Sequence, residues 1–211
     1  MRKITALLGD FYHPEEYFKE ALDYVVNDEA LKDVKLSCIN ISEFLSNIQE
    51  KPNMIIIGRE NKIEPTKEDS EIWMNSEIEV AILNYVKDGG IIFAWHSGLA
   101  SYDPEGIYVK DILRGYFKYH PEKKMVKYYG KLFEKDKNIE FQLIDEHYFV
   151  HCDEERTNVF LFSESEDGKS VAGWYHNYEK GKIICLTPAH NESLKDENFR
   201  IFLKELIKWL I

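Results

Sequence analysis

The chain contains only three cysteines, Cys38, Cys152 and Cys185. They are an odd number with no closely spaced pair, so a disulfide framework is not expected and a reducing compartment fits better. Cys38 and Cys185 lie in apolar runs, where a thiol behaves as a small hydrophobic group.

Long apolar runs are also missing. None approaches the roughly 20 residues that a membrane-spanning helix needs. After Met-Arg-Lys, the N-terminus continues for only five apolar or small residues before Gly9, which is too short for a signal peptide. We therefore expect a soluble cytoplasmic protein that has no membrane partner.

The sequence has no excess of basic residues. It carries 38 acidic and 27 basic side chains, for a formal net charge of −11. A protein that binds nucleic acid needs a basic face, so nucleic acid is not an expected partner. Solubility is the simpler interpretation of the negative charge.

Known cofactor signatures are absent from the sequence. It has no glycine-rich dinucleotide fingerprint, no phosphate loop and no pair of cysteines separated by two residues. A Gly-x-Ser-x-Gly motif is not present either, because Trp95 stands where the first glycine should be. No cofactor is therefore indicated, and a bound divalent metal stays open.

The first half of the chain has the pattern of an α/β protein. A length of 211 residues with 44% hydrophobic content suits one domain over residues 1–211. Apolar runs predict strands at 4–8, 36–41, 54–58 and 91–95, and a helix is predicted at 14–27. Ser76 and Glu79 have the spacing of a capping box for a second helix, which Gly89-Gly90 would end. This alternation implies a mostly parallel sheet flanked by helices.

The second half is richer in predicted strands. Candidates lie at 141–144, 159–162, 171–175 and 182–186, with Gly181 in the turn that joins the last two. A helix over residues 193–211 is expected to close the chain, with these side chains facing inward: Phe199, Phe202, Leu206 and Leu210.

Ionisable side chains follow several of these strands. Ligands of an open parallel sheet bind at the carboxyl ends of its strands, so these positions are the candidates for a site. One predicted edge collects His13, His96 with Ser97, Glu146 with His147, and His190.

Residues 94–98, Ala-Trp-His-Ser-Gly, have the layout of a nucleophile elbow. In such an elbow a strand delivers one residue on a tight turn, and small neighbours allow close approach. His96 holds the elbow position, where a neutral imidazole acts as a general base or a metal ligand. The alternative is that His96 only caps the turn, and these residues alone leave both interpretations open.

Plainer interpretations apply to the other histidines. Taken alone, His190 is a loop residue bound to the backbone, and His120 marks a turn before Pro121. His147 and His151 are four residues apart, but the segment between them is expected to be loop or strand, which argues against a helical metal pair. His176 is expected to be solvated near a hairpin.

Several different short motifs follow one another in a specific order over nearly the whole chain. They are Asp10-Phe11-Tyr12-His13-Pro14, Trp73-Met74-Asn75-Ser76, Gly89-Gly90 before Phe93-Ala94-Trp95-His96-Ser97-Gly98, Phe117-Lys118-Tyr119-His120-Pro121, Asp145-Glu146-His147-Tyr148, and Gly181-Lys182 before a strand ending near His190. Together they resemble the ThuA-like family, which is named for trehalose utilisation.

That family is similar in fold to the class I glutamine amidotransferases. The resemblance implies an α/β, flavodoxin-like three-layer sandwich with a mostly parallel central sheet and extra strands in the second half. In those amidotransferases a cysteine occupies the elbow and a His-Pro-Glu segment completes the triad. Here the elbow holds His96, and the late segment is His190-Asn191-Glu192. Without a thiolate, glutaminase activity is not expected.

The resemblance implies a role in the utilisation of trehalose, another disaccharide or a keto-sugar. His96, Glu146 and His190 are the expected catalytic residues of a hydrolase or isomerase that uses acid/base or metal-assisted chemistry. The residues expected to contact a carbohydrate substrate are His13, Ser97, His120 and Tyr148.

A second hypothesis is a non-catalytic module on the same fold that binds a sugar or a protein partner. The missing thiol favours the module, whereas the collection of ionisable groups at one edge favours the enzyme. Self-association into a homo-oligomer stays open.

Overall fold

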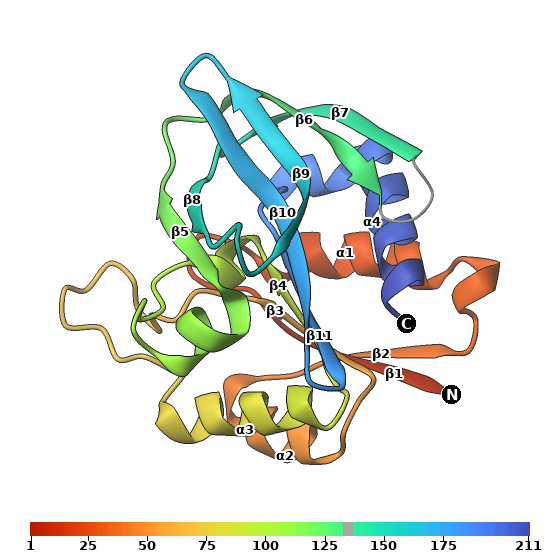
Figure 1. Cartoon of the computed structure of the whole chain (residues 1–211), viewed down its shortest axis with the longest axis vertical. Helices are drawn as coiled ribbons and strands as arrows, with labels where there is room; N and C mark the ends of the chain where they lie inside the picture. The colour runs from red at the N-terminus through yellow and green to blue at the C-terminus, as the bar shows by residue number, and fades with distance from the viewer. Residues whose placement is uncertain (133–136) are drawn as a thin grey trace.

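The computed structural model describes residues 1–132 and 137–211, and its centre is one large, strongly bent sheet (Figure 1). The strands of this sheet are β1 (Arg2–Leu8), β2 (Val34–Cys38), β3 (Met54–Gly58), β4 (Ile91–Trp95), β6 (Lys124–Leu132), β7 (Lys137–Asp145), β9 (Asn158–Ser165), β10 (Gly168–Tyr178) and β11 (Gly181–Leu186). They lie in the order β2-β1-β3-β4-β11-β10-β9-β6-β7. A separate two-stranded sheet pairs β5 (Gly115–Tyr119) with β8 (Phe149–Cys152).

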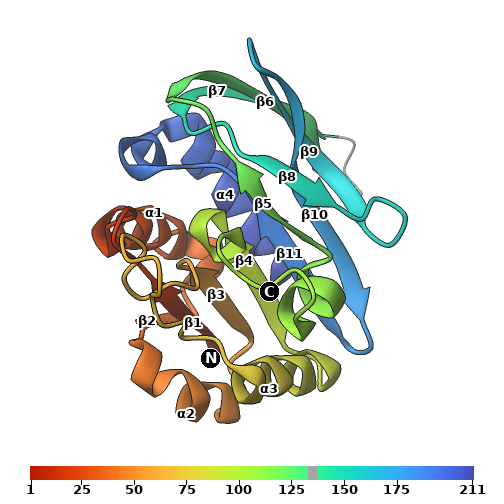
Figure 2. The same ribbon diagram turned by 90° about the vertical axis from the view of Figure 1, so that its left-hand side faces the viewer.

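The five strands from β2 to β11 are all parallel. Helices α1 (Glu15–Val26) and α4 (Glu197–Leu210) cover one face, and α2 (Phe44–Gln49) and α3 (Ser76–Lys87) cover the other (Figure 2). Successive side chains of a strand point to opposite faces, so Ile56 packs with α1 and α4 while Ile55 and Ile57 pack with α2 and α3. This confirms the predicted three-layer α/β fold with a mostly parallel sheet.

The remaining strands, β10, β9, β6 and β7, pair antiparallel and continue the sheet. They bend over α4, where Phe141 of β7 contacts the rings of Phe199 and Phe202. Four antiparallel pairings lead from β11 to β7, so β7 runs in the same direction as the parallel strands. The bend therefore returns the carboxyl end of β7 toward the carboxyl ends of β4 and β11.

Several expectations about single elements were wrong. Helix α3 is capped by Asn75, whose side chain accepts from the Ile78 N–H at 3.0 Å, and Glu79 instead accepts from the Tyr108 N–H at 3.0 Å. The Ser76–Glu79 spacing is therefore not a capping box. His176 is also not solvated, because β10 places it at 3% exposure inside the protein.

The predicted closing helix is two elements. A 3₁₀ turn covers Asn191–Lys195, and α4 starts afterwards because the Asp196 carboxylate accepts from the Phe199 N–H at 2.9 Å. Strands β5, β6 and β8 and the short helix α2 were not predicted. The strand predicted at 36–41 ends at Cys38, because Asn40 and Glu43 form the capping box of a helical turn.

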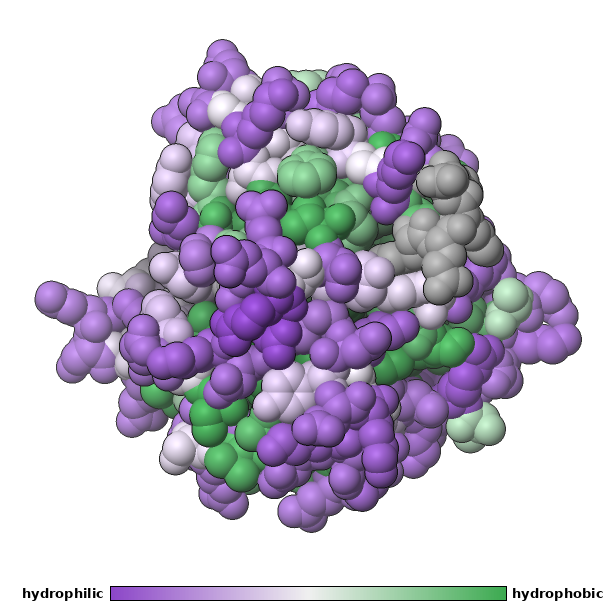
Figure 3. Space-filling model, in the orientation of Figure 1, coloured by the Kyte–Doolittle hydropathy of each residue, from purple (hydrophilic) through white to green (hydrophobic). Residues whose placement is uncertain are grey.

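The face of the molecule seen in Figure 3 is mostly hydrophilic, which agrees with a chain of 31% charged residues. Within residues 1–132 and 137–211, no helix has both the length and the apolar character needed to cross a membrane.

Candidate functional site

His96 lies at the sharp turn where β4 ends, as the elbow pattern predicts. Its φ is 49°, in the left-handed region that a non-glycine residue rarely adopts. Gly98 permits this turn, because a Cβ there would lie 1.9 Å from the carbonyl oxygen of Ile57. Strain of this kind is common where a side chain must be held for function.

Four ionisable side chains meet at this turn, namely His13, His96, Glu146 and His190. One ligand atom from each lies within 4.8 Å of all the others. They follow β1, β4, β7 and β11, whose carboxyl ends share one edge of the bent sheet. The structure thus brings together the three predicted catalytic residues and one residue that was predicted to bind substrate.

Glu146 lies between the histidines. Its Oε1 is 3.2 Å from His190 Nδ1, and its Oε2 is 3.8 Å from His96 Nε2. The same Oε2 is 3.7 Å from Nε2 of His120, which is part-exposed. One carboxylate therefore faces three imidazole nitrogens.

The outer nitrogen of each buried histidine has a partner that only accepts hydrogen bonds. His13 Nδ1 lies 2.6 Å from Asp10 Oδ1, and His96 Nδ1 lies 2.6 Å from the carbonyl oxygen of Thr187. His190 Nε2 lies 3.4 Å from the carbonyl oxygen of Tyr12. For His13 and His96 these partners assign the N–H to the outer nitrogen, so in a neutral ring the inner nitrogen carries a lone pair. His190 has an acceptor beside each nitrogen, because Glu146 Oε1 lies 3.2 Å from its Nδ1.

The three inner nitrogens are His13 Nε2, His96 Nε2 and His190 Nδ1. Each is buried and makes no hydrogen bond of good geometry among the residues that the structure describes, although His190 Nδ1 lies 3.2 Å from the Glu146 carboxylate. Burial, with the neighbouring histidines, lowers the pKa of His96 well below its usual value and that of His190 to about 4. Three imidazole nitrogens thus face each other and a carboxylate, an arrangement that attracts a cation.

These four groups fit a divalent metal by donor type and by their surroundings. Three imidazoles and one carboxylate suit Zn²⁺ and similar ions, and a ligating histidine usually donates its other N–H to a carboxylate or carbonyl. Ligands of a tetrahedral site lie about 3.3 Å apart when metal–nitrogen distances are 2.0–2.1 Å. The largest separation here is 4.8 Å, so small side-chain movements would complete such a site.

Two buried aspartates position the cluster. Asp10 accepts from the His13 ring, from the backbone N–H groups of Tyr12 and His13, and from the Glu60 N–H. Burial alone would raise the pKa of Asp10, but the hydrogen bond from His13 and these N–H groups lower it. Asp10 is therefore an ionised anchor for the His13 ring.

Asp145 connects the two halves of the sheet. Its Oδ1 accepts from the backbone N–H groups of Glu146 at 3.0 Å and His190 at 2.9 Å, and its Oδ2 accepts from the Tyr128 hydroxyl at 2.8 Å. Burial raises the pKa of Asp145 to about 7, although these hydrogen bonds oppose the rise. One side chain thus fixes the spacing between two members of the cluster.

A cavity of about 340 Å³ opens beside the cluster. Glu146, His13 and His190 reach its wall, while the fully buried His96 lies behind them and stacks on the ring of Tyr148 at 4.2 Å. The wall also includes Tyr12, Glu60, Ser101, Phe117, His120 and Tyr148.

Three of the four predicted substrate contacts, His13, His120 and Tyr148, line this cavity. Ser97 does not, since its side chain is fully buried beneath the turn. His147 is held by Ser163 and Ser165 away from the cluster, and His151 is exposed on β8. Sequence reasoning missed Glu60, although it follows β3 by two residues and the rule of strand ends applies to it equally.

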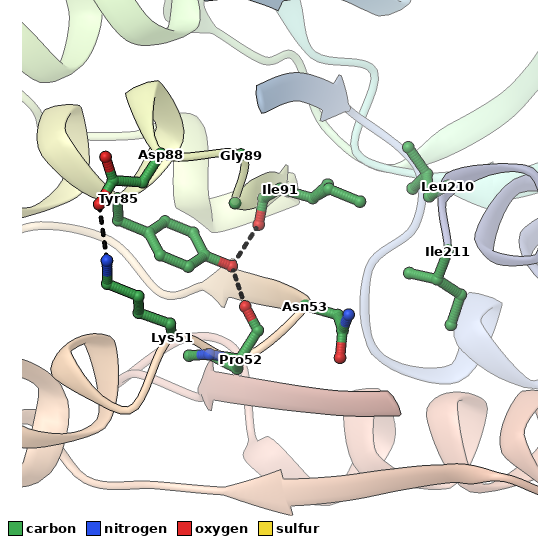
Figure 4. A pocket seen from close by; sticks show the side chains of 10 residues that line it. Lys51, Pro52, Asn53, Tyr85, Asp88, Gly89, Ile91, Leu210 and Ile211 are labelled. Atoms are coloured by element: carbon green, nitrogen blue, oxygen red, sulfur yellow. Dashed lines mark hydrogen bonds and ion pairs between the residues drawn. The ribbon is translucent and has the colours of Figure 1, made fainter. Parts of the chain in front are cut away.

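A second cavity, of about 380 Å³, lies at the opposite edge of the parallel strands (Figure 4). The Tyr85 hydroxyl lies 2.9 Å from the carbonyl oxygen of Pro52 and 3.3 Å from that of Ile91. Lys51 pairs with Asp88 across its rim. The side chains of Tyr85, Lys51 and Asp88 thus have partners within the protein. They are therefore less available to bind a ligand or to catalyse a reaction than the groups that line the smaller cavity.

Solved structures similar to this chain share its fold at low sequence identity. Cytoplasmic protein STM1381 from Salmonella typhimurium LT2 has a TM-score of 0.64 and 13% identity over 99% of both chains. The GH42 β-galactosidase Gan42B from G. stearothermophilus has a TM-score of 0.65 and 11% identity, over 100% of this chain and 30% of that one. The carbohydrate deacetylase Agd3 has a TM-score of 0.57 and 8% identity, over 100% of this chain and 32% of that one.

The chain thus spans about a third of the length of the β-galactosidase and deacetylase chains that it matches. Among curated protein sequences, none matches it significantly. The family model described as ThuA, trehalose utilisation, matches residues 55–210, a range that includes three members of the cluster. Together with the fold, this match shows that the chain belongs to the ThuA family.

Proposed function

We propose that this chain is a cytoplasmic, metal-dependent enzyme of carbohydrate utilisation. The observation that carries the proposal is the set of three inner imidazole nitrogens that converge with the Glu146 carboxylate beside a cavity. The description of the ThuA family supports the substrate class. The free thiols Cys38, Cys152 and Cys185 support a reducing compartment.

His13, His96, His190 and Glu146 would hold the cation. A bound divalent ion supplies a concentrated positive charge, with which metalloenzymes polarise an oxygen of the substrate. The chain's own residues keep that charge in place, because Asp10, Thr187 and Tyr12 fix the ring orientations through the outer nitrogens.

His120 is the residue best placed to exchange a proton with the substrate. It lines the cavity, donates from Nδ1 to the Pro121 carbonyl at 2.8 Å, and directs Nε2 toward Glu146. Its exposure leaves it more accessible to a ligand than His13 and His190, which reach the wall but are buried, and than His96, which lies behind them. Acid/base chemistry on a hydroxyl or carbonyl next to the cluster follows from this arrangement.

Cation binding provides the first test. The metal content of the purified protein would be measured, and Zn²⁺ and Mn²⁺ would be titrated into chelator-treated protein by calorimetry. We expect one cation per chain, and a loss of affinity of at least 100-fold in His96→Ala and His190→Ala. His151→Ala is the matched control, because His151 is exposed outside the cluster. Equal affinity in wild type and His96→Ala would refute the metal site.

Turnover provides the second test. Trehalose, other disaccharides and their keto forms would be screened with the metal-loaded protein, with His96→Ala as the inactive control. Turnover that persists in His96→Ala would contradict the catalytic assignment. Sugar binding with no cation and no turnover would favour the alternative, a non-catalytic sugar-binding module.

A further inference from the structure

Glu60 is a buried acid on the cavity wall that the cation cluster does not use. Its exposure is 6%, yet it lines the same cavity as His13, Glu146 and His190. The Ser101 hydroxyl donates to Oε2 at 2.8 Å. The other oxygen, Oε1, is buried and has no hydrogen-bond partner within residues 1–132 and 137–211.

The backbone around Glu60 is firmly held. The Glu60 N–H donates to Asp10 Oδ2 at 3.0 Å, and the Trp73 indole N–H donates to the Glu60 carbonyl at 3.1 Å. On the preceding residue, the Arg59 carbonyl accepts from the Tyr102 hydroxyl at 2.6 Å. The loop between β3 and α3, at the left of Figure 1, is thus fixed at its start, and Glu60 has a defined place on the wall.

Asp10 links this carboxyl to the cation cluster. One Asp10 oxygen accepts from the Glu60 backbone and the other from the His13 ring, so both walls of the cavity share one anchor. Burial raises the pKa of Glu60 and the charge of Asp10 adds to the rise, while Ser101, His13 and Lys62 act against it. The nearby phenols of Tyr102 and Tyr148 stay neutral, because burial raises their pKa values well above 10.

A buried carboxyl oxygen without a partner is costly, and a ligand that donates a hydrogen bond to it removes that cost. A hydroxyl is such a donor. The wall also offers the rings of Tyr12, Phe117 and Tyr148, which suit the apolar face of a compact polyol. At about 340 Å³ the cavity is near the lower limit of small-molecule sites, which span roughly 300–1,000 Å³.

We propose that Glu60 and Ser101 form a hydroxyl-binding subsite that orients one sugar ring against the cation cluster. A small movement of the Glu60 side chain would expose the buried Oε1 to a ring hydroxyl, which then donates a hydrogen bond to it, while Ser101 holds Oε2. The inference rests on the proposed function for the chemical class of the ligand. It adds that the cavity encloses one sugar ring and that Glu60 selects this ring.

Sugar binding to the intact chain tests the subsite, with D-glucose and trehalose as probes and ligand-observed NMR as the readout. Wild type is expected to bind at least one probe. Glu60→Ala is expected to bind it at least 10-fold more weakly, because a hydrogen bond to a charged or buried carboxyl is lost. Glu60→Gln, which keeps the size and one acceptor, should lose roughly 3- to 10-fold and guards against misfolding of the alanine variant.

Glu64→Gln is the matched control, because Glu64 lies on the same loop but is exposed and paired with Lys67. It should bind the probes as wild type does. Cation affinity in Glu60→Ala should stay within about twofold of wild type, since Glu60 is not a ligand of the cluster.

Equal sugar affinity in wild type and Glu60→Ala would overturn the subsite, and so would a wild type that binds neither probe. If sugar binding depends on Glu60 but His96→Ala leaves cation binding unchanged, the subsite stands and the metal-dependent function fails.

Discussion

The parallel and antiparallel halves of the sheet contribute to the site in different ways. In the parallel half, β3 is buried along its whole length, and the ionisable residues of the cluster follow the carboxyl ends of its strands. In the antiparallel half, β6 alternates between the core and the solvent. The parallel half supplies the three buried histidines, and the antiparallel half supplies Glu146, with His120 and Tyr148 on the segments beside it. The three imidazoles of the parallel half thus form the site together with groups from the antiparallel half.

The site depends on the bend of the sheet. Asp145 at the end of β7 binds the backbone of both Glu146 and His190, so one buried side chain joins the two halves. Substitutions in the parallel half should therefore act mainly on stability and on the histidines. Substitutions in the antiparallel half should either disturb the junction that Asp145 makes between the two halves or have little effect.

The largest expected effect is that of Gly98→Ala in the parallel half. The new Cβ would lie 1.9 Å from the Ile57 carbonyl oxygen, so the backbone of the elbow would have to move. We expect a loss of more than about 4 kcal/mol in the free energy of unfolding, measured by urea denaturation. Gly168→Ala in the β9–β10 hairpin is the comparison. There φ is 129° but the nearest atom is 3.7 Å away, so about 1–2 kcal/mol is expected. Equal losses would contradict the proposed difference between the halves.

Asp145→Asn tests the junction. The unfolded pKa is near 3.8 and the folded pKa is about 7, so the folded state loses stability as pH rises from about 4 to 7. This difference corresponds to roughly 4 kcal/mol once pH exceeds 7. Asparagine retains an acceptor for both N–H groups but does not ionise, so the variant should lack this decline. Denaturation between pH 4 and 8 measures it, and parallel pH profiles for the two proteins would refute the assignment.

Asp10→Ala should remove the hydrogen bond that orients the His13 ring in the parallel half. Removal of its carboxylate frees the His13 ring and leaves the Glu60 N–H without its acceptor. Loss of such an outer partner typically lowers metal affinity 10- to 100-fold, and calorimetric titration would measure it. Asp153→Ala is the matched control on a loop beyond β8, where the carboxylate binds Arg156 outside the cluster. A similar loss of affinity in both variants would point to general destabilisation.

The smallest expected effect is a gain of about 1–2 kcal/mol from His176→Phe in β10. Both ring nitrogens of His176 are buried without a hydrogen-bond partner among the described residues. Burial, with Arg114 and Arg156 nearby, lowers the pKa of His176 to about 3. Wild type should therefore lose stability as pH falls from about 6.5 toward 3, and the variant should lack this pH-dependent loss of stability. Thermal denaturation at pH 5 and pH 8 tests this, and a variant less stable than wild type at both would contradict it.

The parallel half and the position of the candidate site can be predicted from the amino-acid sequence alone. Apolar runs such as Met54–Gly58 are recognisable because both faces of a central parallel strand are covered, and their ends direct attention to His13, His96 and His190. The elbow at His96 was predictable because it needs a small neighbour, which Gly98 supplies. Because the elbow holds His96 and not a cysteine, the sequence alone also predicts the absence of glutaminase activity.

The spatial arrangement of these residues and their partners depends on the tertiary structure. Strands β5, β6 and β8 have mixed polar and apolar residues, since one face of each is partly exposed, and local pattern did not identify them. The bend that brings Glu146 to 3.2 Å from His190 arises from packing over α4, which no local run of residues encodes. The inward lone pairs of the histidines and the unpartnered oxygen of Glu60 follow from contacts between distant segments, because the partners of a buried polar group depend on the whole fold.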